Sequence, residues 1–342
     1  MISSQVQRGA YVLDWRSWQD DSSKADATRK QRTIFLKLLS QANSKDADSL
    51  ISDVLSDKIT VYQSASKLLN WLRETNHKPS TVSVYRTLIP PFFKAVLGSQ
   101  NFDEQAFELL VPNGDSYVST TKKAPTLEEV RKMVSLASPR DRVLIGLLCS
   151  GMRIGEAVSR RMSDLQVRPK GYGRIKLQAK STKKRRKRFV FLTTEAVKWI
   201  EGYHRGLKVG GSETWILPGE KRNHLSEESG YGIFKGSKSS VGLFERAGLF
   251  DAEDEIYSPH SFRSFASSTL RRSGINDSWV DAIVGQMSRL GAKSHYLDWD
   301  QVEIDWSEKA HDNFLIEQKA EPVSLQQRVR MLENELRELK AR

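Results

Sequence analysis

The sequence predicts a mainly α-helical protein of two domains, in which an all-α domain precedes a larger α+β domain that carries a small β-hairpin or sheet. Three observations indicate this fold class. Apolar residues recur at three- and four-residue spacing along most of the 342 residues. A segment rich in turn formers, 113–125 within VPNGDSYVSTTKKAP, divides the chain like an interdomain linker. Two short apolar segments further on are separated by a cationic stretch, which is typical of a hairpin with an exposed turn.

The first segment, residues 1–45, is expected to be an N-terminal extension. It mixes Tyr11, Trp15 and Trp18 with charged residues, and a helical period emerges only at TRKQRTIFLKLLSQA. The sequence leaves three alternatives open for this extension: an arm-binding module, an oligomerisation element, or neither of these.

Residues 46–112 are expected to form a helical domain. DADSLISDVLSD, TVYQSASKLLNWLRETN and SVYRTLIPPFFKAVLG each have helical apolar spacing. Thr60, and either Ser80 or Thr81, stand where N-caps belong. Pro90 and Pro91 are expected to end or kink the third helix, because proline donates no amide and disfavours helix in the residue before it.

The second domain is expected over 126–310. Thr126 with acids in the first turn predicts a capped helix over TLEEVRKMVSLA, and DRVLIGLLCSG predicts another. GRIKLQAK and RFVFLTTEA are expected to pair as the hairpin. The glycine-bearing segments KVGGSE and SGYGIF are expected to be turns without chemistry.

The last segment, 311–342, carries apolar residues at alternating spacings of four and three: Leu325, Val329, Leu332, Leu336 and Leu339. This a/d pattern indicates a coiled coil or a helix that binds in a groove. Little more than two heptads is marginal alone, so a partner surface is expected.

Charge and composition point to a polyanionic partner in a reducing compartment. The chain has 54 Lys and Arg against 42 Asp and Glu, a net charge of +12. No apolar run reaches the ~18 residues of a membrane span, so a cytoplasmic protein without membrane contact is expected. The single cysteine, Cys149, excludes an internal disulfide and a multi-cysteine zinc site. Neither HExxH nor GxxxxGK[ST] occurs, which disfavours a zinc protease or a P-loop ATPase.

Four fragments carry candidate chemistry: SGMRIGEA around Arg153, the basic run from Lys180 to Arg188, SPHSFRSFA around His260 and Arg263, and SHYLD around Tyr296. Two guanidinium groups can clamp the non-bridging oxygens of a phosphodiester and stabilise its transition state. His260 and Arg263 are three residues apart, which places both on one face of a helix. A tyrosine needs a base or a nearby cation to attack phosphorus, because its phenol has a pKa of about 10.

In this order, Arg, Lys, His-x-x-Arg and Tyr, the motifs resemble those of the tyrosine recombinases, the phage integrase, Cre and Xer superfamily, over about 125–300. The resemblance implies an all-α core-binding (SAM-like) domain over 46–112 and a catalytic domain over 126–310. It implies DNA strand cleavage and rejoining without metal, ATP or other cofactor.

The resemblance also assigns roles. Tyr296 would attack the scissile phosphate, form a 3′-phosphotyrosine link and release a 5′-hydroxyl. Lys180, or as second choice Lys183, would protonate the leaving oxygen from the hairpin turn. His260 would bind the phosphate or act as general acid or base, and Glu156 would orient an active-site cation.

The rest of the basic run is expected to contact DNA phosphates beside the active site: Lys183, Lys184, Arg185, Arg186, Lys187 and Arg188. One position departs from the family pattern. Gln286 stands where the family commonly has His or Trp; its amide can donate to phosphate but cannot relay a proton.

The leading hypothesis is a site-specific recombinase or integrase that acts on double-stranded DNA. If the chain follows the family, four protomers assemble on two sites, pass through a Holliday junction and exchange C-terminal segments. A nucleoid-associated protein encoded by a virus or mobile element is expected. A type IB topoisomerase-like enzyme and a catalytically weak DNA-binding relative are the alternatives.

Overall fold

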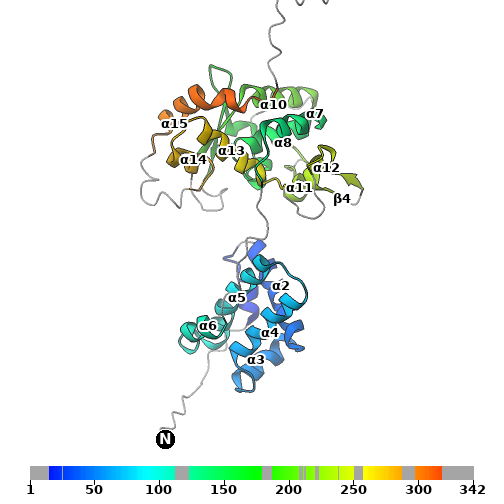
Figure 1. Cartoon of the computed structure of the whole chain (residues 1–342), viewed down its shortest axis with the longest axis vertical. Coiled ribbons are helices and arrows are strands. Elements are labelled where there is room, and N and C mark those ends of the chain that lie inside the picture. Colours follow the sequence, from blue (N-terminus) through cyan, green and yellow to red (C-terminus); the bar gives the residue numbers. More distant parts are fainter. Residues whose placement is uncertain are drawn as a thin grey trace, which may run out of the picture. The chain divides into compact units, whose positions relative to one another are not determined.

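The chain forms two compact units, Met1–Thr120 and Thr121–Arg342 (Figure 1). The computed structural model describes residues 15–24, 26–111, 123–178, 187–207, 211, 213–219, 223–237, 239–249, 257–286 and 297–317. Helices dominate both units, and the β-structure of the described residues is a three-stranded sheet and a two-stranded ribbon. The predicted fold class, mainly α with a small sheet, is confirmed.

The first unit is all-helical in its described residues. Its elements are α1 (Trp15–Gln19), α2 (Asp26–Asn43), α3 (Ala47–Leu55), α4 (Val61–Glu74), α5 (Pro79–Leu97), η1 (Ser99–Asn101) and α6 (Glu104–Leu110). The predicted cap at Thr60 is present: its side chain accepts from the Gln63 amide, and the Gln63 side chain accepts from the Thr60 amide. This capping box satisfies two amides that the first turn of α4 would otherwise leave without partners.

The helices α1 and α2 belong to the core of this unit, which differs from the extension expected over 1–45. Trp18 and Phe35 are buried, and Trp18 contacts Phe92 of α5 edge-on at 5.3 Å between ring centroids. Phe35 contacts Phe92 in the same manner at 5.6 Å. Aromatic burial of this size contributes much of the stability of a small helical core, so the first helices are structural parts of the unit.

The expectation for α5 was wrong about its N-cap and about an end of the helix at the prolines. The helix runs through Pro90 and Pro91 without ending, and its N-cap is Lys78, followed by Pro79 in the first turn, instead of Ser80 or Thr81. Proline suits the first turn, where its missing amide costs nothing. The two internal prolines are held in the helix by buried neighbours, Phe92 and Phe93 among them, which are fully inaccessible to solvent.

The second unit has more elements. They are α7 (Leu127–Leu136), α8 (Pro139–Cys149), α9 (Ile154–Val158), η2 (Met162–Asp164), β1 (Leu165–Val167), β2 (Gly173–Leu177), β3 (Arg188–Leu192), α10 (Thr194–Leu207), α11 (Glu227–Lys235), β4 (Gly236–Ser237), β5 (Ser240–Val241), α12 (Leu243–Arg246), α13 (Ser261–Arg272), α14 (Asp277–Ile283), α15 (Trp299–Asp305), the π-helix η7 (Trp306–Ala310) and η8 (His311–Phe314). The capping box predicted at Thr126 forms with Glu129. SGYGIF lies within α11 instead of a turn.

The predicted hairpin is confirmed as two antiparallel strands, β2 and β3, with Ile175 opposite Val190. β1 adds a third strand on the other side of β2, with Leu165 opposite Ile175. Ile175 and Val190 are both fully buried, so the sheet presents an apolar face to the core. α8 packs between α10 and α13 in this core. Residues 179–186, between β2 and β3 in the sequence, lie outside the described residues, so the predicted turn stays a prediction.

At its C-terminal end the described chain closes against the same core through Trp306, Phe314 and Ile316. The leucine-spaced positions from Leu325 to Leu339 lie outside the described residues, so the predicted tail helix stays a prediction. Among the described helices, none combines the length and the apolar character needed to cross a membrane.

Candidate active site

Arg153 is presented by a tight turn between two helices of the second unit. α8 ends at Cys149, Gly151 follows with φ of +87°, and Arg153 is the N-cap residue of α9. A positive φ suits glycine, which explains the Gly-x-Arg sequence at this turn. The Arg153 amide donates to Glu156 Oε2 at 2.8 Å, and its Nη1 donates to Glu156 Oε1 at 3.0 Å. The guanidinium is therefore oriented by one carboxylate while 27% of its side chain remains exposed.

Arg263 lies against the same turn from another helix. It stands in the first turn of α13, for which His260 is the N-cap residue. Its Nη1 donates to the Gly151 carbonyl at 2.7 Å, and only 3% of the residue is exposed. Among the described residues its Nη2 has no hydrogen-bond partner. A buried guanidinium N–H without a partner is costly, and an anionic ligand is one way to satisfy it.

Glu156 pairs with a second arginine that the sequence analysis placed elsewhere. Arg188, expected as an exposed DNA contact, is 1% exposed and donates from Nη2 to Glu156 Oε2 at 2.6 Å. Its Nη1 donates to the Ile283 carbonyl at the end of α14. The expectation was wrong because Arg188 is the first residue of β3 and shares a strand face with buried Val190. Arg188 thus ties Glu156 to α14 from within the core.

Arg188 limits which residue can follow α14 at position 285. Gly285 has φ of +67°, and a Cβ at this position would lie 2.8 Å from Arg188 Nε. Glycine is therefore required on two grounds, conformation and space. The next residue, Gln286, is partly buried, and its backbone N–H donates to the Asp281 carbonyl at 2.6 Å. Gln286 is thus held directly beside the residue that packs on Arg188.

Two guanidinium groups, those of Arg153 and Arg188, pair with the one Glu156 carboxylate, and that of Arg263 lies nearby, which leaves positive charge in excess. Burial and repulsion by Arg188 and Arg153 lower the pKa of Arg263 to about 9. Burial also lowers the pKa of Arg188, against the opposing effect of Glu156. For Glu156, burial raises the pKa, but Arg188, Arg153 and Arg263 outweigh it and the net shift is downward. The carboxyl is ionised at neutral pH, and the cluster favours an anionic ligand.

A pocket of about 330 Å³ brings Arg153, Glu156 and His260 together. His260 is exposed at the start of α13. Glu227 and Tyr231 of α11 complete the wall, and the sequence analysis assigned no role to either. Tyr231 lies in SGYGIF, which was expected to be a turn, and no motif surrounds Glu227, so no local signal marked either residue as part of a site.

The other predicted site residues lie outside the described part of the chain: Lys180, Lys183, Lys184, Arg185, Arg186 and Tyr296. Lys187 is described and exposed, as a phosphate contact requires. The described residues therefore bring together Arg153, Glu156, His260 and Arg263, with Gln286 nearby through Arg188. Within the described ranges, no group of three or more His, Cys, Asp or Glu is arranged to hold a metal ion.

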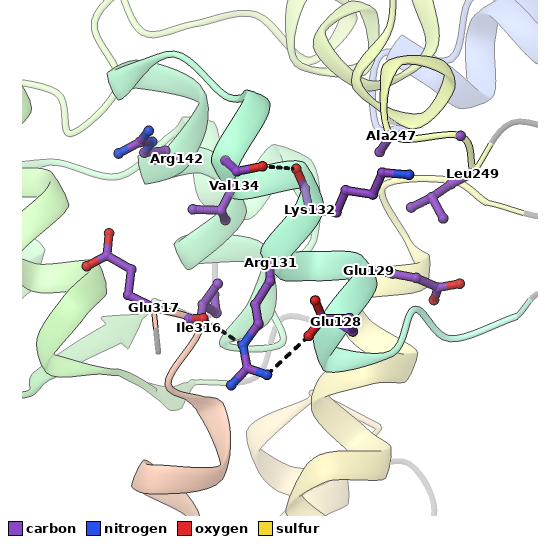
Figure 2. Close-up of a pocket in the computed structure, with 12 residues that line it drawn as sticks. Glu128, Glu129, Arg131, Lys132, Val134, Arg142, Ala247, Leu249, Ile316 and Glu317 are labelled. Atoms are coloured by element: carbon purple, nitrogen blue, oxygen red, sulfur yellow. Dashed lines mark hydrogen bonds and ion pairs between the residues drawn. The ribbon is translucent and has the colours of Figure 1, made fainter. Parts of the chain in front are cut away.

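A larger pocket, of about 750 Å³, is lined by none of the predicted site residues (Figure 2). It lies between α7, residues 247–249 and the chain at 316–317. Figure 2 shows Arg131 between Ile316 and Glu128: its Nε donates to the Ile316 carbonyl at 2.9 Å, and its Nη1 pairs with Glu128 at 3.3 Å. These contacts fasten the last described residues to α7, and we assign this pocket no chemistry.

Comparison with known families decides the classification of the chain. A family model described as the phage integrase family matches residues 124–301, which is more than half of the chain and contains Arg153, His260, Arg263 and Tyr296. The chain belongs to the phage integrase family. The resemblance to tyrosine recombinases noted in the sequence is thereby confirmed.

Solved structures share the fold of this integrase-family chain. The Tn1549 transposon integrase in complex with circular intermediate DNA matches with a TM-score of 0.57 and 13% identity, covering 81% of this chain and 92% of that one. The lambda integrase tetramer bound to a Holliday junction matches with a TM-score of 0.57 and 14% identity, covering 82% and 78%. A lambda integrase dimer bound to a COC′ core site gives 0.52 and 15%, covering 79% and 94%. Curated protein sequences give no match.

Proposed function

We propose that this chain is a site-specific DNA recombinase that cuts and rejoins strands through a covalent link to Tyr296. The observation that carries the proposal is the cluster in which Arg153 and Arg263 meet at one turn, with Glu156 ionised between Arg153 and Arg188. A phosphodiester is an anion that suits two neighbouring guanidinium groups, and among the described residues the Arg263 Nη2 has no hydrogen-bond partner. The DNA-bound integrases with the same fold add support for a DNA substrate.

In the proposed cleavage step, the Tyr296 oxygen attacks phosphorus and the bond from phosphorus to the 5′-oxygen breaks. The phenol proton passes to a base, for which His260 is the candidate, and the leaving oxygen takes a proton from Lys180 or Lys183. Arg153 and Arg263 stabilise the charge that develops on the non-bridging oxygens. The reverse attack by a 5′-hydroxyl rejoins the strand, so the scheme itself consumes no ATP and uses no metal ion.

Gln286 has a narrower part in this scheme. Its amide can donate a hydrogen bond to a phosphate oxygen, but it has no titratable proton. We propose that it only orients the phosphate. The exposed Lys187, together with Lys184, Arg185 and Arg186 of the same turn, is proposed to contact the DNA backbone, which makes binding strongly salt-dependent.

Assembly follows from the same family reasoning. The lambda integrase is known as a tetramer on a Holliday junction, and we propose a homotetramer on two DNA sites for this chain. The leucine-spaced tail is the proposed contact between protomers. Deletion of residues 323–342 is expected to weaken the pairing of two sites more than binding to one site. Unchanged oligomerisation on DNA would count against the tail. The family also supports an origin in a virus or mobile element.

The test is denaturant-resistant capture of DNA on sheared DNA from the source organism, with wild type and Tyr296→Phe compared and the trapped ends sequenced. Adducts that depend on Tyr296 and concentrate at one sequence are expected, and they also reveal the target site. Adducts scattered without sequence preference would favour a type IB topoisomerase-like enzyme. Binding without any adduct would favour a catalytically weak DNA-binding relative.

A further inference from the structure

A buried carboxylate outside the cluster described above fastens α15 to the three-stranded sheet. Glu303 is 7% exposed and accepts four hydrogen bonds. Arg168, which follows β1, donates from Nε to Oε1 at 2.6 Å and from Nη2 to Oε2 at 2.8 Å. The Tyr172 hydroxyl donates to Oε1 at 2.9 Å, and Arg174 of β2 donates from Nη1 to Oε2 at 2.6 Å.

The contacts of Glu303 with Arg168, Tyr172 and Arg174, called the clamp below, are more than an incidental surface pair. Arg168 binds in the bidentate manner that fixes both distance and orientation. Burial raises the pKa of Glu303, but the donors Arg168, Tyr172 and Arg174 outweigh it and lower the pKa overall. Ion pairs buried to this degree contribute little net stability compared with apolar packing, so their value lies in fixing one arrangement.

Aromatic contacts reinforce the same interface. The ring of Trp299, the first residue of α15, meets Phe189 of β3 edge-on at 5.3 Å between centroids. The guanidinium carbon of Arg174 lies 3.9 Å from the centroid of the Phe189 ring. Trp306, directly after α15, stacks on Phe191 of β3 at 5.2 Å. Both ends of the helix are therefore held by the sheet, with Glu303 between them.

The interface around Glu303 lies close in the sequence to the proposed nucleophile and to the proposed general acid. Tyr296 immediately precedes Leu297, at which the described chain resumes, and α15 begins three residues after Tyr296. Asp298 caps the helix by accepting from the amides of Asp300 and Gln301, both at 3.1 Å. β2 and β3 are the strands that flank the 179–186 turn, in which Lys180 and Lys183 lie.

We propose that Glu303 is a positioning residue, which holds the segment that follows Tyr296 against the sheet whose turn carries the lysine. The proposal rests on the recombinase function proposed above. The nucleophile and the general acid act on opposite sides of one phosphorus atom. Fixing the segment after Tyr296 and the strands that flank the lysine segment against each other therefore lowers the entropy lost on reaching the reactive geometry. Among the described residues Glu303 bonds to Arg168, Tyr172 and Arg174, none of which has a role in the proposed chemistry, so its effect is expected in the chemical step and not in DNA binding.

The test compares Glu303→Gln with a matched control on the same helix, Asp305→Asn. Both changes remove one negative charge, but among the described residues the bonds of Asp305 stay within its own segment, to Lys309 and Gln301. The first readout is hydrogen exchange of the 297–305 amides in the full chain without DNA. Faster exchange in Glu303→Gln, with Asp305→Asn much closer to wild type, is expected; exchange at the wild-type rate in Glu303→Gln overturns the clamp.

The second readout separates chemistry from binding on the duplex site recovered by the capture experiment. Glu303→Gln is expected to form the covalent adduct about 100-fold more slowly, the cost of a misplaced reacting group, with an unchanged Kd for DNA. A wild type that forms adducts and a Glu303→Gln variant that forms them equally fast overturn this proposal alone. A wild type without adducts overturns the recombinase function as well.

A third variant covers the case in which Glu303→Gln fails to fold. Arg168→Gln removes one donor whose side chain is 30% exposed and leaves Glu303 paired with Arg174. The same separation of adduct rate from DNA binding is expected, to a smaller extent. Equal adduct rates in Arg168→Gln and wild type would overturn the clamp on this second measurement.

Discussion

Replacing Arg188 with methionine is expected to destabilise the second unit even when no DNA is present. The change removes the partner at 2.6 Å from a Glu156 carboxylate that is 3% exposed, together with the donor to the Ile283 carbonyl. Removing one partner of a buried ion pair costs roughly 3–5 kcal/mol. Relief of the repulsion that lowers the pKa of Arg263 offsets part of this cost. We therefore expect a loss of about 3 kcal/mol in the free energy of unfolding.

The assay is urea-induced unfolding of the full chain followed by tryptophan fluorescence, with separate transitions fitted for the two units. Lys187→Met is the matched control, because it also replaces a positively charged side chain with methionine, at the adjacent, exposed position. The double variant Arg188→Met with Glu156→Gln is expected to lose less stability than the sum of the two single variants, since Arg188 and Glu156 pair with each other and are removed together. An Arg188→Met variant as stable as Lys187→Met would refute the reasoning and return Arg188 to the DNA-contact role that its sequence position suggests.

Three further outcomes are expected. Gly285→Ala is expected to cost about 2 kcal/mol, because an L-residue is strained at φ of +67° and its Cβ would crowd Arg188, whereas Gly202→Ala, with open space around it, is expected to keep or raise stability by urea unfolding. The folded-state pKa of Glu303 lies below its reference value of 4.5, so the ionised carboxylate stabilises the fold above about pH 4.5 and this stabilisation is lost as the pH falls further. The unfolding free energy of Glu303→Gln is therefore expected to fall less steeply with acid than that of wild type. Parallel slopes for the two proteins would contradict the lowered pKa. Thr126→Ala, which removes the capping box of α7, is expected to cost about 1 kcal/mol in the same assay, and a change near zero would contradict the cap.

Much of the fold is readable from local signals in the sequence. Thr126 with Glu129 specifies a helix start by side-chain hydrogen bonds alone, and the structure has that cap. The β2–β3 hairpin is predictable because a cationic stretch divides two apolar segments. The helix α5 does not end at Pro90 and Pro91, although both disfavour helix, because the adjacent side chains of Phe92 and Phe93 are buried in the core. Local rules are least reliable where packing is strongest.

In the candidate site too, some residues are predictable from local sequence signals and others only from the tertiary structure. Arg153, His260 and Arg263 are recognisable from motif order, and the structure brings Arg153 and His260 to one pocket and Arg263 to the turn before Arg153. Arg188 was misassigned because it ends a run of basic residues, and net charge cannot tell which member of a run turns inward. Strand alternation with buried Val190 was the available signal.

The role of Glu303 lies beyond the reach of sequence reasoning for a related reason. Its partners, Arg168 and Arg174, stand well over a hundred residues earlier, and no local pattern connects them to α15. Only the folded chain shows that the segment after Tyr296 is fastened to the sheet.

The most direct test of the account is the chemical identity of the linkage between protein and DNA. Captured adducts are digested with nuclease and protease, and the remaining peptide is sequenced by mass spectrometry. The account predicts a peptide in which Tyr296 carries a nucleotide through its 3′-phosphate, absent from both Tyr296→Phe and Arg263→Ala. A nucleotide on any other residue, or an adduct that persists in Tyr296→Phe, would contradict it.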